Sequence, residues 1–108
     1  MIEKVYKMSD SDKSVIEPVI KDENINFMHM VLLKGEALKT HYTNANVYMT
    51  VVKGTLSLSL ENGNIATYEN NTVIKIPFNT KMDAKNLNEE TLELFVVKAP
   101  APGEFYSK

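Results

Sequence analysis

The chain has 108 residues, of which 44% are hydrophobic, and its 12 basic and 14 acidic residues give a formal net charge of −2. This length supplies one hydrophobic core and not two, and the near-neutral charge without a basic cluster argues against nucleic acid as a partner. The absence of cysteine excludes disulfides, thiolate nucleophiles and cysteine-based zinc sites. No apolar run approaches the roughly 18 residues that span a bilayer, and the N-terminus lacks a signal-peptide pattern. We therefore expect a cytoplasmic globular domain with no membrane partner.

The first quarter of the chain predicts edge strands and loops over residues 1–24. Residues 2–8 alternate loosely between apolar and polar side chains, and residues 14–20 form a second short apolar piece. Pro18 in that piece removes a backbone donor, which favours the edge of a sheet. The next stretch, from Ile25 to Leu33, is apolar on both faces and predicts a strand that is buried on both sides and ends before Gly35.

Five further short strands are predicted, with turns between them, at residues 47–52, 56–60, 65–68, 73–76 and 92–97. Residues 56–60 alternate strictly between Leu and Ser, and the pair Asn62-Gly63 predicts a tight hairpin after them. No window carries the start and stop signals of an amphipathic helix. The sequence thus predicts an all-β fold, a sandwich, barrel or jelly roll, followed by a Pro-rich tail over residues 99–108.

Two stretches carry glycine, histidine, proline and asparagine at a characteristic spacing. In residues 35–54, five residues separate Gly35 from His41, and Gly54 closes the stretch; residues 71–86 contain Pro77 and end at Asn86. These stretches resemble the two sequence motifs of the cupin family, the first motif at 35–54 and the second at 71–86. The flanking strands fit the layout of that family from about Ile25 to Val97.

The resemblance implies a single cupin domain over residues 1–108, a cupin-type jelly-roll β-barrel with its pocket inside the barrel. It also implies assembly as a homodimer, for which Tyr48, Thr50 and Val52 offer an outer face. The family's usual metal centre takes three imidazoles and one carboxylate. Here Thr43, Val47 and Met82 stand at three of these four positions and only His41 keeps a ligand side chain. We therefore expect a degenerate metal site, with no metal and no other cofactor.

His29 is the other histidine of the chain. Side chains alternate with period two along a strand, which places His29 opposite Met28 and Met30. Because the resemblance places the face of Met30 inside the barrel, we expect His29 on the outer face, as a packed or interface histidine. A replacement metal ligand is the less favoured interpretation.

The candidate ligand-binding residues are those that the motifs and the strand parity place inside the barrel: His41, Thr43, Met30, Val47, Met49 and Met82. Methionines can fill a core or form the permissive wall of a pocket, and the sequence leaves both open. It also leaves open whether His41 is a structural imidazole bonded to Thr43 or backbone, or a polar anchor or proton-transfer group. We assign no catalytic residue.

The favoured hypothesis for function is a metal-free small cupin that binds a small organic ligand or plays an accessory or sensing role. The alternative is an enzyme of the isomerase, epimerase or dioxygenase type that uses His41, with a rebuilt metal site including His29 if it depends on metal. A filled interior would instead indicate a purely structural or protein-interaction role. No residue identifies the ligand.

Overall fold

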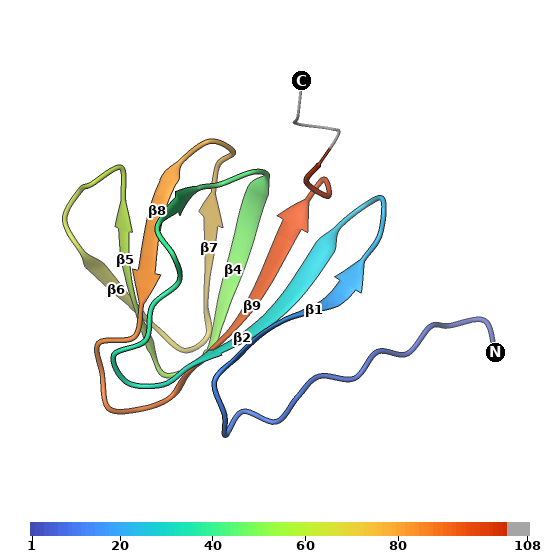
Figure 1. The fold of residues 1–108 in the computed structure, drawn as a ribbon, viewed down its shortest axis with the longest axis horizontal. Coiled ribbons are helices and arrows are strands. Elements are labelled where there is room, and N and C mark those ends of the chain that lie inside the picture. The colour runs from blue at the N-terminus through green and yellow to red at the C-terminus, as the bar shows by residue number, and fades with distance from the viewer. Residues whose placement is uncertain (104–108) are drawn as a thin grey trace.

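The computed structural model describes residues 1–103. Within that range the chain forms nine strands and no helix (Figure 1). The strands are β1 (Val15–Lys21), β2 (Asn26–Leu32), β3 (His41–Tyr42), β4 (Asn46–Lys53), β5 (Thr55–Leu60), β6 (Ala66–Glu69), β7 (Thr72–Ile76), β8 (Lys81–Lys85) and β9 (Leu92–Ala99). The predicted all-β class is confirmed, and no described segment is a helix able to cross a membrane.

The strands form two antiparallel sheets that enclose the core. One sheet has the order β1-β2-β9-β4-β7 and the other the order β3-β8-β5-β6. The last strand, β9, pairs with both β2 and β4, so segments far apart in the sequence lie side by side (Figure 1). This arrangement is the jelly roll that the motifs imply.

The strands predicted from residue 25 onward are all present, and two short ones were not foreseen. The predicted strands correspond to β2, β4, β5, β6, β7 and β9. The additional strands are β3, of two residues, and β8, which pairs with both β3 and β5. In β8 only Met82 and Ala84 point to the core, so its apolar pattern is too short to stand out in the sequence.

The N-terminal prediction needs a correction. Residues 2–8 contain no strand, and the edge strand predicted there is wrong within this chain. The segment leads away from the body of the protein (Figure 1), so no neighbouring strand offers partners to its backbone. The sheet edge is β1, where the register with β2 shifts between Pro18 and Ile20, as a proline at an edge allows.

Two motif positions that lack glycine still adopt the left-handed backbone conformation that favours glycine. Gly35 and Gly54 both have φ of 83°, and Asn71 and Asn79, which stand where the motif usually has glycine, have φ of 71° and 63°. Asparagine tolerates this left-handed region better than most residues. These two departures from the cupin pattern therefore keep the turns.

The hairpin between β5 and β6 is confirmed, but it starts one residue earlier than the pair Asn62-Gly63 indicates. Its central residues are Glu61 and Asn62, with φ of 52° and 59°, and the Gly63 amide donates to the Leu60 carbonyl at 2.9 Å. Two positive φ values at the central positions are typical of a two-residue hairpin loop.

Asn86, the last residue of the second motif, has a structural role. Its side chain is fully buried, and its amide donates to the carbonyls of Leu32 and Glu90, both at 2.9 Å. Its oxygen accepts from the Asn88 amide. Asn86 therefore fastens the loop before β9 to the end of β2.

The start of the predicted Pro-rich tail is fixed to the body. Ala101 is buried, and its amide donates to the Asn24 carbonyl at 3.0 Å. Residues 104–108 of that prediction lie outside the described residues.

Candidate ligand pocket

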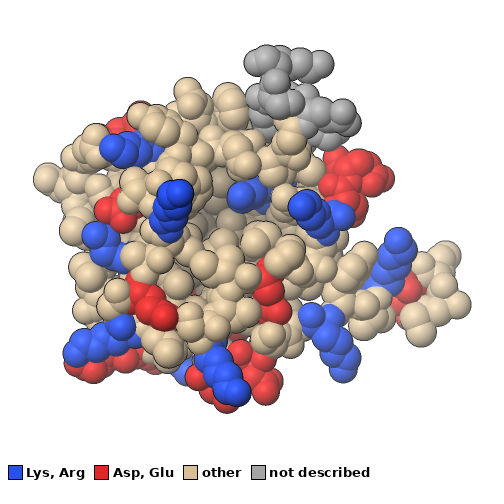
Figure 2. All heavy atoms as spheres, in the orientation of Figure 1, with Lys and Arg blue, Asp and Glu red and all other residues tan. Residues whose placement is uncertain are grey.

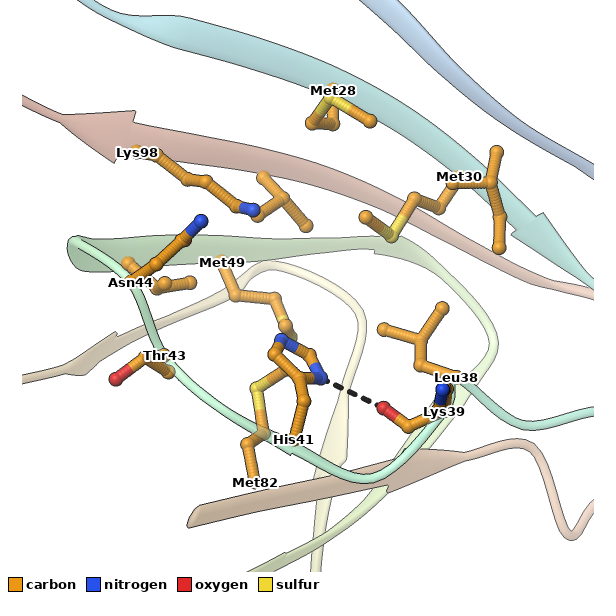
Figure 3. A pocket seen from close by; sticks show the side chains of 13 residues that line it. Met28, Met30, Leu38, Lys39, His41, Thr43, Asn44, Met49, Met82 and Lys98 are labelled. Atoms are coloured by element: carbon orange, nitrogen blue, oxygen red, sulfur yellow. Dashed lines mark hydrogen bonds between the residues drawn. The ribbon is translucent and has the colours of Figure 1, made fainter. Parts of the chain in front are cut away.

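A cavity of about 220 Å³ lies between the two sheets (Figure 3). Its wall comes from β1, β2, β4 and β9 of the first sheet and from β3 and β8 of the second. In the orientation of Figure 1, Figure 2 shows the surface hollowed near its centre, with basic side chains close to the hollow. All six candidate residues from the sequence lie in the cavity wall: His41, Thr43, Met30, Val47, Met49 and Met82.

The deep part of the cavity is apolar. Val47, Met49, Met82 and Val96 are at most 4% exposed, and Met28 and Met30 extend the same surface toward the edge of the sheet. Val47, Met49 and His41 therefore face the same interior space, as their alternation in the sequence predicts. Met28, Met30, Met49 and Met82 all line this cavity.

His41 is oriented by the backbone. Its Nδ1 lies 2.7 Å from the Lys39 carbonyl oxygen. A carbonyl only accepts, so Nδ1 carries the proton of this bond and Nε2 is left for other contacts. Within residues 1–103, His41 has no carboxylate partner: Asp83 pairs with Lys85, and Glu93 contacts His29. His41 is therefore both bonded to the backbone and part of the pocket wall.

The hydroxyl of Thr43 makes two hydrogen bonds to the backbone. It donates to the Pro77 carbonyl at 2.7 Å and accepts from the Thr80 amide at 2.9 Å. Both bonds tie the end of β3 to the loop that follows β7. Thr43 lines the pocket, but we infer that it shapes the wall and leaves the polar contacts to its neighbours.

Three polar residues of the wall are not among the candidates predicted from the sequence: Lys39, Asn44 and Lys98. Lys98 could have been found from parity, because it continues the inward series Leu92, Leu94 and Val96 along β9. Burial lowers the pKa of Lys98 below its usual value. Lys39 and Asn44 lie outside the strands, where no periodicity indicates the direction of a side chain.

The residues present do not fit the usual cupin metal centre. Of the four family positions, His41 supplies one imidazole, the hydroxyl of Thr43 is already bonded, Val47 has no donor atom, and Met82 offers a thioether. A thioether is a soft donor that suits Cu(I) better than hard divalent ions. Within residues 1–103, no group of three or more His, Asp or Glu side chains could hold a metal ion.

His29 lies on the outer face of the first sheet, as predicted, between two glutamates. Its Nδ1 lies 2.7 Å from Oε2 of Glu17 on β1, and its Nε2 lies 2.7 Å from Oε2 of Glu93 on β9. The imidazole has no solvent exposure. This position corrects the alternative of a rebuilt metal site, since His29 points away from the pocket and cannot join His41 there.

Within the Glu17–His29–Glu93 cluster, His29 and Glu17 have shifted pKa values. Burial opposes a charge on His29, but the hydrogen bonds to Glu17 and Glu93 raise its pKa above the ordinary 6.5. The same bond from His29, followed by bonds from the amide and hydroxyl of Ser9, lowers the pKa of Glu17 below 4.5. The cluster therefore favours a protonated imidazole between carboxylates, and it joins three neighbouring strands.

The chain is 40% identical over 103 residues to the uncharacterized protein MJ0764 of Methanocaldococcus jannaschii, covering 94% of this chain and 89% of that protein. The crystal structure of that relative, described as an RmlC-like cupin family protein with a double-stranded β-helix fold, superposes with a TM-score of 0.91 and covers 94% of each chain.

The fold recurs in more distant proteins. A cupin superfamily protein from Desulfitobacterium hafniense superposes with a TM-score of 0.72 at 5% identity, covering 86% of this chain and 83% of that one. No family model matches the sequence. The 40% identical relative and its double-stranded β-helix fold agree with the motifs at 35–54 and 71–86, and the chain belongs to the cupin family.

Proposed function

We propose that this cupin binds a small organic molecule in its pocket without a metal, in an accessory or sensing role. The observation that carries the proposal is the cavity of about 220 Å³ with its apolar floor and polar rim. Pockets for drug-sized ligands occupy roughly 300–1,000 Å³, so this cavity suits a smaller molecule. The ligand would lie on Met49 and Met82, with His41 beside it.

An isomerase, epimerase or dioxygenase role for His41 has less support. A catalytic imidazole is usually oriented by a carboxylate, whereas the described partner of His41 is a backbone carbonyl. The donor set around His41 also does not suit a metal-dependent reaction. Ligand binding requires neither feature.

The methionines provide a direct test of pocket binding. Four of the six methionines line the cavity (Met28, Met30, Met49 and Met82), whereas Met1 and Met8 lie in the exposed N-terminal segment and serve as internal controls. With [¹³C-methyl]methionine protein, we expect small apolar fragments such as hexanol to shift the four pocket methyl signals in NMR spectra. The signals of Met1 and Met8 should stay unchanged.

A matched pair of substitutions places the binding site. Ile16, half-exposed on the edge strand β1, lines the cavity, whereas Val73 is exposed on the edge strand β7 and does not. Ile16→Trp should obstruct the cavity and weaken the shifts, and Val73→Trp should leave them intact. If a broad set of small fragments moved none of the four pocket signals, the proposed function would be wrong.

We also propose that the protein acts as a homodimer in the cytoplasm. The dimer is supported by the N-terminal segment, which extends from the body (Figure 1). Its apolar side chains are largely exposed. Met1, Ile2 and Val5 are 98%, 100% and 67% exposed. A second copy of the chain could cover them.

Sedimentation at micromolar protein concentration tests the dimer. We expect the native chain to sediment as a dimer, and the double variant Ile2→Glu/Val5→Glu to shift toward monomer, because charged side chains resist burial in an interface. The matched control, Lys4→Glu, changes charge at an intervening position without removing an apolar group. A native chain that sediments as a monomer would contradict the proposal.

A further inference from the structure

We propose that the ligand of the pocket is a small organic anion, of which a short aliphatic carboxylate is the simplest example. Lys98 and His41 would hold its charged group at the rim, and its apolar part would lie on the floor. This inference rests on the proposed function and assigns a chemical class to the ligand.

The charge of the cavity wall is one-sided. The wall contains two lysines, Lys39 and Lys98, and none of its residues is acidic. The chain as a whole has the opposite balance, with 14 acidic residues against 12 basic ones. A cation as ligand would find no compensating charge here, whereas an anion would find the ammonium group of Lys98.

Lys98 is the residue that points most directly to an anion. Its neighbours across the sheet are Asn26 on β2 and Val47 on β4, and its amine is directed into the cavity (Figure 3). Within residues 1–103 its amine has no carboxylate partner, unlike Lys34 and Lys85, which pair with Glu89 and Asp83.

The environment of Lys98 disfavours an uncompensated charge. The side chain is partly buried beside apolar residues, and this burial lowers its pKa. A partly desolvated ammonium gains more from an anionic partner than an exposed one does, because the surrounding medium screens the pair less. A bound carboxylate would therefore stabilise the charged form of Lys98.

His41 approaches the same space from the other sheet. Lys98 is on β9 of the five-stranded sheet and His41 is on β3 of the four-stranded sheet, and Figure 3 shows both side chains directed into the cavity. Because Nδ1 of His41 is held by the Lys39 carbonyl, Nε2 is the atom available to the ligand. When protonated, it would donate to a carboxylate oxygen.

The change from a polar rim to an apolar floor indicates the chemistry of the ligand's uncharged part. The cations are on partly exposed side chains near the rim, whereas Met49, Met82 and Val96 at the floor are almost inaccessible. A molecule that matches this gradient has a charged head and a short apolar tail. A highly polar dianion would leave the floor uncovered.

The test compares three ligands that share a six-carbon chain and differ in the charge of the head group. Hexanoate, hexanol and hexylamine would be titrated into native protein, with the four pocket methionine signals as the readout. We expect hexanoate to bind at least about tenfold more tightly than hexanol, since a hydrogen bond to a charged group is stronger than one between neutral groups. Hexylamine should bind most weakly.

Lys98→Met removes the charge and keeps an unbranched side chain one atom shorter, and the four native pocket signals remain the readout. In this variant the advantage of hexanoate over hexanol should disappear, while hexanol still binds, which also shows that the pocket is intact. Lys53→Met, at an exposed lysine outside the wall, is the matched control and should behave as native protein.

The outcomes separate this inference from the proposed function. Equal binding of hexanol and hexanoate, tightest binding of hexylamine, or an unchanged hexanoate preference in Lys98→Met would overturn the anion assignment and leave pocket binding in place. Failure of every fragment, neutral ones included, to shift the pocket signals would contradict both.

Discussion

Gly54→Ala is expected to lower the free energy of unfolding by about 2–5 kcal/mol, the sum of left-handed backbone strain and overpacking. The φ of Gly54 is 83°, and a Cβ atom there would lie 2.4 Å from the Thr91 carbonyl oxygen and 3.0 Å from the Leu92 Cα. Both contacts are to backbone at the start of β9, which cannot rotate away as a side chain can. Urea denaturation monitored by circular dichroism measures the effect.

Gly35→Ala is the matched control, because Gly35 has the same φ of 83° but no atom beyond its chain neighbours within 4 Å of the position that a Cβ would take. It should carry only the backbone strain, about 1–2 kcal/mol. The difference between the two variants therefore measures the steric contribution at Gly54. Equal destabilisation by the two substitutions would show that the approach of Thr91 to Gly54 is not tight in solution.

The same two glycines explain why the fold could be predicted from the sequence. Gly35 and Gly54 mark turns whose backbone few residues adopt, and the period-two pattern between them orients Val47 and Met49 to the interior. Asn71 and Asn79 preserve the turns of the second motif without glycine. Local backbone requirements and strand parity are properties of short segments, so a single sequence displays them.

The missed features depend on contacts between distant segments. Lys98 faces a pocket that exists only after β9 has inserted between β2 and β4. Glu93 is 64 positions from His29 in the sequence, and its contact requires the same insertion. The edge strand predicted at residues 2–8 failed for the converse reason, since an alternating pattern indicates a strand but does not supply the neighbour that it must pair with.

The buried cluster on the outer face leads to the second large effect. His29 bridges Glu17 of β1 and Glu93 of β9, so it connects the edge of the sheet to its centre. Ser9 also donates to Glu17 from its amide and hydroxyl, which ties the N-terminal segment to the same group. Replacing His29 would leave two carboxylates facing each other without the cation between them.

His29→Gln is expected to destabilise the fold most between pH 4.5 and 6.5, the ordinary pKa values of Glu17 and His29. The raised pKa of His29 contributes stability that is complete below 6.5 and is lost as the pH rises through the folded-state value. The lowered pKa of Glu17 contributes stability that is complete above 4.5 and is lost as the pH falls through its folded-state value. Within the window we expect a loss of about 1.5–3 kcal/mol.

Urea denaturation across this pH range, on native protein and two variants, measures the cluster. Native protein should be most stable inside the window, and His29→Gln should flatten the profile, because glutamine keeps a hydrogen-bonding group but cannot be protonated. His41→Gln, at the other of the chain's two histidines, should keep the native profile, since the described partner of His41 is a backbone carbonyl and not a carboxylate. A native profile in His29→Gln, or a flattened one in His41→Gln, would mean that the Glu17–His29–Glu93 cluster does not set the pH dependence of folding.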